Sequence, residues 1–173
     1  MNEPRAVELS AYSPLWPAVF GIERERLLKV FAPVEVAIEH IGSTAVPGLG
    51  AKPIIDMMLG APSLAAIDAR IADLEAEGYR YVPEFEKAMP ERRYLVKPDG
   101  QPGSFQLHAV VKDTAFWKRH LAFRDALRAD PRLAQEYWKL KQRLSARFPN
   151  DRAAYTDAKA AFIRAAVEKF TAP

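Results

Sequence analysis

The chain has 173 residues, of which 49% are hydrophobic, and it carries a net charge of +3. A chain of this size can bury a substantial core as one compact unit, and the absence of cysteine excludes disulfide bonds, thiolate zinc sites and cysteine nucleophiles. No run of about 18 apolar residues occurs, and the N-terminus has neither a basic nor an apolar signal region. We therefore expect a soluble, cytoplasmic protein without a membrane partner.

The charge is unevenly distributed along the chain. Residues 1–111 carry 11 Lys and Arg against 15 Asp and Glu, a net charge of −4, whereas residues 112–173 carry 14 against 7, a net charge of +7. A basic helical wall that faces an anionic ligand would account for this excess, and so would the solvated faces of amphipathic helices. Both interpretations stay open.

The N-terminal half predicts helices and strands around a Gly- and Pro-rich loop at 42–53. Ser13 is expected to cap the first helix, with Pro14 at its first position. β-branched and apolar runs on both sides of the loop predict two strands, the second apolar on both faces as a covered strand would be. The predicted elements are a helix over 14–31, strands over 34–41 and 53–59, and a helix over 63–77.

The second half predicts short strands followed by a helical tail. Turn material at 97–103 separates two of the extended segments. The tail has three capping signals, each before an amphipathic run: Asp113 or Thr114, then Asp130 with Pro131, then Asn150 or Asp151. The predicted elements are strands over 79–83, 92–97 and 104–112 and helices over 115–129, 132–148 and 152–170.

This order of elements favours an α+β fold, in which a mixed β-sheet with flanking helices is followed by a C-terminal helical bundle. We expect an α/β core over residues 1–112 and a helical region over 113–173 that packs on it, so that the two form one compact unit.

A Gly-Ser-Thr turn precedes an aspartate that interrupts an apolar strand, in the segment "HIGSTAVPGLGAKPIIDMML". Gly42 permits close approach of the backbone, and the hydroxyls of Ser43 and Thr44 can hold a phosphate group. Asp56 is a hard oxygen ligand that could coordinate Mg²⁺ beside that phosphate. Lys52, just ahead of the strand, would add a positive charge, or would be a solvated loop residue.

The three histidines are further candidates. As neutral imidazoles near Asp56, His40, His108 and His120 could bind a metal or act as general acid and base, or each could be a hydrogen-bonded structural residue. We expect His108 to act with Asp56 in catalysis, His40 or His108 to assist Asp56 in holding a metal, and His120 to bind the ligand.

Basic and aromatic residues farther along the chain extend the candidate site. Arg93 is a candidate anion ligand, since guanidinium groups bind phosphate in a bidentate manner, although it could equally be a charge at a strand edge. His120 and Arg124 lie four residues apart on one predicted helix, and Tyr155 and Lys159 four apart on another, so each pair shares a helix face. These faces either close over the phosphate or face the solvent. Three tryptophans and four phenylalanines are interpreted as core rather than as platforms for nucleic-acid bases: Trp16, Trp117, Trp138, Phe116, Phe123, Phe148 and Phe162.

The motifs "HIGST", "VPGL", "KPIID", "RRYLV", "LHAVV", "RHLAFRDALRADP" and "YTDAKAAFI" resemble, in order and spacing, those of the GrpB-like proteins. That family is largely uncharacterised and is similar in fold to the nucleotidyltransferase superfamily, and related domains occur fused to dephospho-CoA kinase. The resemblance implies a polymerase-β-like nucleotidyltransferase core. Within it, Gly42 and Ser43 match the phosphate-binding turn, and Asp56 matches the first metal-binding carboxylate.

The superfamily pattern has a second carboxylate two residues after the first, on the same face of the strand. That position is Met58 here, and a thioether is too soft a ligand to replace a carboxylate for Mg²⁺. The late strand that would supply a third carboxylate has His108 instead.

Two functions from different classes follow. The first is an enzyme that binds a nucleotide or another phosphorylated small molecule, with metal-dependent phosphoryl or nucleotidyl transfer as its reaction and Mg²⁺ as its cofactor. The second is a non-catalytic binding or accessory module that keeps the fold without a complete metal site. An RNA partner for the basic tail ranks last, because the aromatic positions resemble core.

Overall fold

The computed structural model describes residues 7–98 and 103–172, so the tip of the predicted turn, 99–102, lies outside the described residues. Within them the chain forms a mixed five-stranded sheet in the order β1-β2-β5-β4-β3. Strands β2 and β5 run parallel, and the other neighbours are antiparallel. The strands are β1 (Ala37–Ile41), β2 (Ile54–Ala61), β3 (Arg80–Tyr81), β4 (Arg92–Lys97) and β5 (Ser104–Val111).

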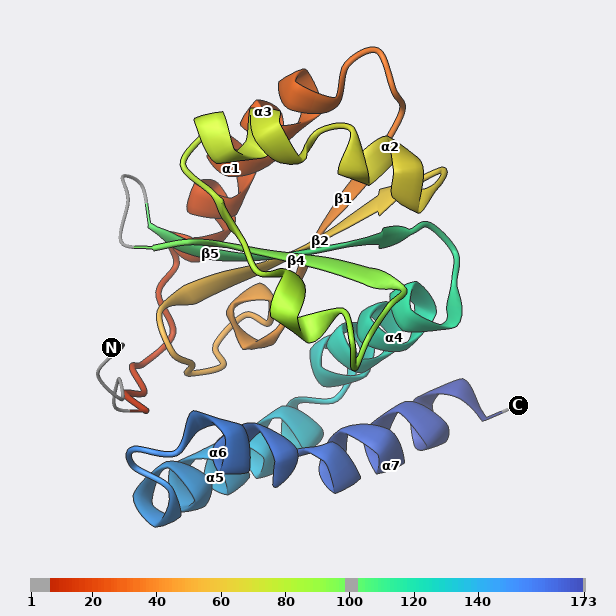
Figure 1. Cartoon of the computed structure of the whole chain (residues 1–173). Helices are drawn as coiled ribbons and strands as arrows, with labels where there is room; N and C mark the ends of the chain where they lie inside the picture. Colours follow the sequence, from red (N-terminus) through yellow and green to blue (C-terminus); the bar gives the residue numbers. More distant parts are fainter. Residues whose placement is uncertain (1–6, 99–102, 173) are drawn as a thin grey trace.

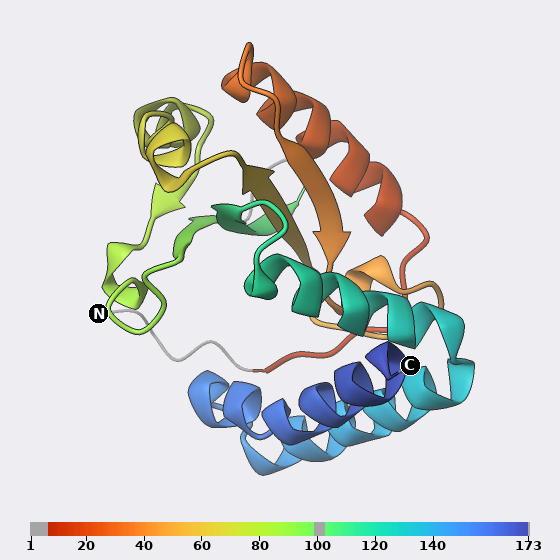
Figure 2. The ribbon, with the colours of Figure 1, turned by 90° about the vertical axis from the view of Figure 1, so that its right-hand side faces the viewer.

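Helices cover both faces of this sheet (Figure 1). One face is covered by α1 (Trp16–Phe31), α2 (Leu64–Asp68) and α3 (Ile71–Ala76). On the other side lie α4 (Ala115–Ala129), α5 (Pro131–Arg147), α6 (Arg152–Asp157) and α7 (Ala160–Thr171). Figure 2 shows α4 next to the sheet and α5, α6 and α7 beyond it. The predicted mixed sheet with a helical tail is therefore confirmed.

Two predicted helices are interrupted. The helix expected over 63–77 divides into α2 and α3 at Arg70, which leaves the helical conformation with φ −111° and ψ 1°. The last helix divides into α6 and α7 at residues 158–159. The strand expected over 79–83 is only two residues long, because the 3₁₀ turn Pro83–Phe85 follows it closely.

The capping signals are confirmed in part. Asp130 caps α5 by accepting hydrogen bonds from the backbone N–H groups of residues 132 and 133, and Asp151 caps α6 in the same way. Thr114 lies at the start of α4, but its hydroxyl donates to the carbonyl of Val111 instead. Ser13 accepts from the N–H of Leu15, and α1 begins two residues later than Pro14.

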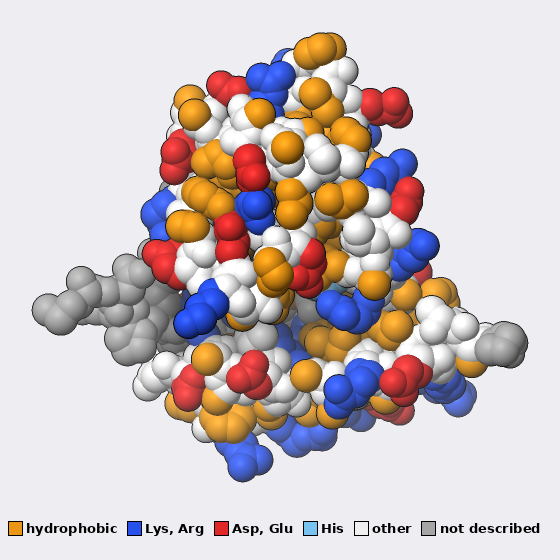
Figure 3. All heavy atoms as spheres, turned by 45° about the vertical axis from the view of Figure 1, so that its right-hand side comes forward, with side chains coloured by type: hydrophobic (Ala, Val, Ile, Leu, Met, Phe, Trp, Pro, Cys, Tyr) orange, Lys and Arg blue, Asp and Glu red, His pale blue; other side chains and the backbone are white. Residues whose placement is uncertain are grey.

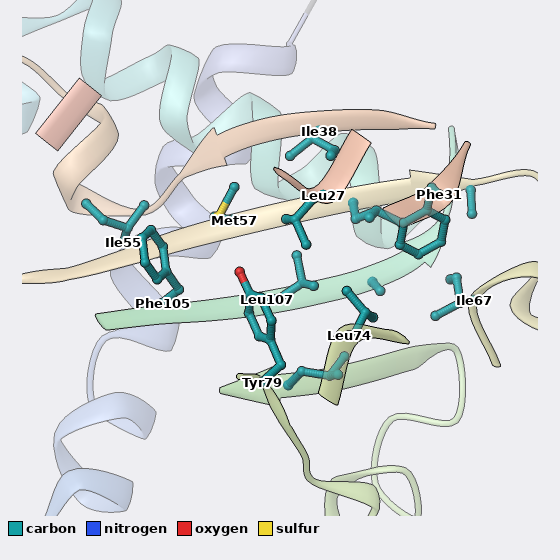
Figure 4. Close-up of a cluster of buried hydrophobic side chains, with 14 of the residues drawn as sticks. Leu27, Phe31, Ile38, Ile55, Met57, Ile67, Leu74, Tyr79, Phe105 and Leu107 are labelled. Atoms are coloured by element: carbon teal, nitrogen blue, oxygen red, sulfur yellow. The ribbon is translucent and has the colours of Figure 1, made fainter. Parts of the chain in front are cut away.

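The main hydrophobic core lies between the sheet and helices α1–α3 (Figure 4). Met57 on β2 is fully buried there, among the side chains of Leu27, Phe31, Ile55, Phe105 and Leu107. Because side chains alternate along a strand, Asp56 and Met58 point to the opposite face, towards α4–α7. The helical tail therefore covers the face that carries the aspartate.

None of the helices in the described part of the chain combines the length and the apolar character that a membrane crossing requires.

Candidate functional site

A cavity of about 270 Å³ lies between the aspartate-bearing face of the sheet and the helical tail. Its wall comes from the loop after β1, from β2 and β5, and from α4, α5, α6 and α7. Figure 3 shows the surface hollowed between the core and the tail helices, with Lys and Arg side chains nearby. The volume is slightly below the range of about 300–1,000 Å³ that is usual for ligand pockets, so it suits a small molecule.

Asp56 and the Gly-Ser turn meet at the base of this cavity. Asp56 pairs with Ile41 across the antiparallel β1–β2 ladder, which places the next residue, Gly42, against the carboxylate. A Cβ atom on Gly42 would lie 2.5 Å from Oδ2 of Asp56, and the backbone there has φ 70° and ψ −172°, a region almost restricted to glycine. The glycine is therefore required both by its backbone conformation and by the closeness of Asp56.

Three lysine side chains line the cavity within the described residues, and each comes from a different element. Lys52 precedes β2, Lys141 lies on α5, and Lys159 is the residue before α7. The amines of Lys52 and Lys159 lie 5.4 Å and 4.4 Å from the ring centroid of Tyr155, which holds them by cation–π contacts. The cavity therefore concentrates positive charge around Asp56.

Lys141 joins the helical tail to the Gly-Ser turn at residues 42–43, which is the candidate phosphate-binding turn. Its Nζ donates to the hydroxyl of Ser43 at 3.0 Å and also to the backbone carbonyl of Gly50. Tyr137, one turn earlier on α5, lines the cavity as well. The Ser43 hydroxyl is thus held by a residue 98 positions away in the sequence.

Burial shifts the pKa values of these groups. Together with the positive charges of neighbouring lysines, it lowers the pKa of Lys141 to about 7 and that of Lys159 to about 8. Burial is also the main reason why the pKa of Lys52 is lowered. Burial raises the pKa of Asp56 to about 6, against the opposing effect of the three lysines. Near neutral pH the site can therefore exchange protons readily.

His108 and His120 form the other end of the cavity wall. Nδ1 of His108 lies 3.1 Å from a guanidinium nitrogen of Arg92, and because arginine only donates, this Nδ1 must accept. Nδ1 of His120 lies 2.8 Å from the carbonyl of Phe116, so it must donate. Burial is the largest effect on both imidazoles, and it lowers their pKa and so favours their neutral forms.

Most of the predicted site residues line this one cavity: Gly42, Ser43, Thr44, Lys52, Asp56, His108, His120, Tyr155 and Lys159. Three others lie elsewhere. Arg93 faces the α1–α3 side of the sheet, where its guanidinium contacts both oxygens of Asp68 at 2.6 and 3.1 Å. Arg124 donates to Glu39 at 2.6 Å and so joins α4 to β1. His40 faces α1, on the side of the sheet opposite to Asp56.

Sequence reasoning missed Lys141, together with Tyr137 and Arg119, which also line the cavity. A signal for Lys141 does exist. On α5, Tyr137, Lys141 and Leu144 are the buried residues, at helical spacing, so the lysine occupies the apolar stripe of an otherwise charged helix. A lysine at such a position requires a polar partner, since an unpaired buried charge is costly.

The donor set around Asp56 does not suit Mg²⁺. Asp56 is the single acidic side chain that lines the cavity among the described residues, which contain no group of three or more potential metal ligands. Met58 lies on the same face, as expected, but it is fully buried against Phe116 and Trp117 of α4. Three nearby amines would repel a divalent cation and attract an anion. Mg²⁺ at this site stays a prediction.

The chain matches the family model for the GrpB protein over residues 6–169. It is 39% identical over 164 residues to UPF0157 protein YqkA of Bacillus subtilis, a match that covers 95% of this chain but 47% of YqkA, so the chain spans about half the length of that relative. The crystal structure of conserved protein GrpB from Enterococcus faecalis superposes with a TM-score of 0.84 at 33% identity, covering 94% of this chain and 96% of that one. The chain is also 27% identical over 192 residues to a dephospho-CoA kinase of Mycolicibacterium paratuberculosis, covering 94% of this chain and 46% of the kinase.

Proposed function

This chain belongs to the GrpB family, and we propose that it binds a nucleotide or another phosphorylated small molecule in the cavity beside Asp56. The observation that carries the proposal is the convergence of Lys52, Lys141 and Lys159 on a small cavity with a single carboxylate. An anion placed between these amines would offset a charge that burial otherwise makes costly.

The Gly-Ser turn supports a phosphate as that anion. The Ser43 hydroxyl faces the cavity and is held in place by Lys141, so a phosphate oxygen could contact the hydroxyl and the amine together. Lysine binds phosphate as a point charge, and hydrogen bonds between charged groups are about twice as strong as those between neutral ones. The ligand would therefore bridge the loop after β1 and the tail helices.

The turn and Asp56 also support the finer proposal of a nucleotidyltransferase-like fold, with phosphoryl or nucleotidyl transfer as its reaction. The accessory-module alternative is favoured by Met58, because α4 packs over the position at which a second metal-binding carboxylate would lie. It also agrees with the similarity to a dephospho-CoA kinase, of which the match covers 46%. Both the transferase and the accessory module would require the same phosphate site.

Calorimetric titration of a panel containing pyrophosphate, ADP, ATP and sugar phosphates tests the proposal. We expect at least one compound to bind, and Lys159→Met to weaken its affinity about tenfold or more, the effect of losing one charged hydrogen bond. Lys169→Met is the matched control, because Lys169 is an exposed lysine on α7, and it should leave the affinity unchanged. A panel without any binder, or equal effects of the two substitutions, would refute the proposed site.

The affinity should also depend on pH in a definite direction. The lysine amines attract phosphate only when protonated, and the pKa values of Lys141 and Lys159 are about 7 and 8, so the affinity should fall as the pH rises from 7 to 9. Below about pH 6 the phosphate itself loses charge, while protonation of Asp56, whose pKa is about 6, removes a repelling carboxylate, so the two effects oppose each other. The same titrations at pH 6.5 and pH 9 measure this effect.

A further inference from the structure

We infer that the histidine end of the cavity recognises a hydroxyl group, so that the ligand is the phosphate of a sugar or polyol, including the ribose of a nucleotide. This inference rests on the proposed phosphate site and names the class of compound that the site takes. The observations that carry it are the opposite hydrogen-bonding patterns imposed on His108 and His120.

In each imidazole, one ring nitrogen already makes a hydrogen bond within the protein. His108 accepts from Arg92 through Nδ1, so in its neutral form the proton is on Nε2, which can donate. His120 donates through Nδ1 to the carbonyl of Phe116, so its Nε2 has a free lone pair and can accept. The cavity wall therefore presents one donor and one acceptor.

The two rings are close enough to serve one group. Their centroids lie 6.2 Å apart, and both side chains line the cavity. A hydroxyl oxygen accepts and donates at once, so it can bridge the two rings with hydrogen bonds of ordinary length, about 2.8 Å. A carboxylate or phosphate, which only accepts, could use His108 but not the lone pair of His120.

The surroundings keep the two rings in this arrangement. The Phe116 ring stacks on His120 with centroids 4.1 Å apart, and Tyr94 packs beside His108 at 5.2 Å. A guanidinium against Nδ1 of His108 opposes protonation of that ring. The two imidazoles at this end of the cavity are therefore preorganised, and Arg119 lies beside them in the cavity wall.

The test compares phosphates that carry hydroxyls with phosphates that lack them. Calorimetric affinities are measured for glycerol 3-phosphate, ribose 5-phosphate, glucose 6-phosphate and AMP, and for propyl and butyl phosphate as alkyl analogues. At least one hydroxylated compound should bind the wild-type protein ten times more tightly than either alkyl phosphate, because a site built for a hydroxyl rejects analogues that lack it. His120→Phe should remove this preference without weakening the alkyl phosphates, whereas Lys159→Met should weaken both classes.

The outcomes separate the two proposals. If alkyl phosphates bind as tightly as every hydroxylated compound, the hydroxyl inference fails while the phosphate site stands. If none of these phosphates binds, the phosphate site fails and the inference fails with it. The comparison among ligands uses the wild-type protein, so it decides the question even if His120→Phe does not fold.

Discussion

Replacing Gly42 with alanine is expected to lower the free energy of unfolding by about 3 kcal/mol or more and to distort the cavity. The backbone at Gly42 has φ 70° and ψ −172°, which costs about 1–3 kcal/mol for any residue with a side chain. The new methyl group would also lie 2.5 Å from the Asp56 carboxylate, so either the turn or the β2 strand must move. Urea denaturation of the purified variant measures the loss.

The substitution Gly48→Ala separates the cost of the backbone conformation from the cost of the contact with Asp56. Gly48 lies in the same loop with φ 78°, but within the described structure no heavy atom beyond its two chain neighbours lies within 4 Å of the position of its added Cβ. Gly48→Ala should therefore lower the free energy of unfolding only through the unfavourable backbone conformation, by about 1–2 kcal/mol, and should leave ligand affinity intact. If the two glycine substitutions cost the same, the contact between the turn and Asp56 is not important for stability.

Replacing Lys141 with methionine is expected to weaken binding of the phosphate ligand about 100-fold. The substitution removes a buried amine at the cavity and releases the Ser43 hydroxyl from its donor, so two groups proposed to contact the phosphate are affected together. Methionine is similar in volume and apolar, and it avoids burying a charge, so the fold should be retained. Titration of the ligand together with a thermal melt measures both effects.

Lys139→Met provides the matched control on the same helix. Lys139 is an exposed residue of α5, two positions before Lys141, and its replacement should change affinity less than twofold. An undiminished affinity in Lys141→Met, with a normal melting temperature, would mean that this lysine only joins the helical tail to the core.

The part of the site that sequence reasoning identified is the part built from neighbouring segments. Gly42 directly follows β1, and Asp56 is the third residue of β2. These two strands are antiparallel neighbours in which Asp56 pairs with Ile41, so the fold of one short segment brings the turn and the aspartate together in space. The alternation of side chains along β2 then fixed Met58 on the same face as Asp56. Neither inference required knowledge of how the helical tail packs.

The residues that sequence reasoning misplaced depend on contacts between distant segments. Arg92 and Arg93 are adjacent and point to opposite faces, and the motif does not reveal which of them shares the face of Asp56. Arg93 pairs with an aspartate 25 residues away, and Arg124 with a glutamate 85 residues away. Any basic residue predicted to bind an anion can instead be neutralised by such a carboxylate, and only the fold decides between the two.

The tail contributes both predicted and unpredicted residues to the helical side of the cavity. Tyr155 and Lys159 were predicted from their shared helix face and do line the cavity, although the helix is interrupted between them. Lys141 could not be predicted as a site residue without knowing that α5 docks against the loop after β1, because its contact with Ser43 spans 98 residues of sequence. Trp117 packs into a core cluster and Trp138 lies against Gly50, in agreement with their interpretation as core.

The most direct test of the account is a crystal structure of the protein with the phosphate compound that binds most tightly in calorimetry. We predict that the phosphate group lies in the cavity, with its oxygens about 2.7–3.2 Å from the Ser43 hydroxyl and from the amines of Lys141 and Lys159. A phosphate bound outside the cavity, or inside it but away from these lysines, would contradict the proposed function.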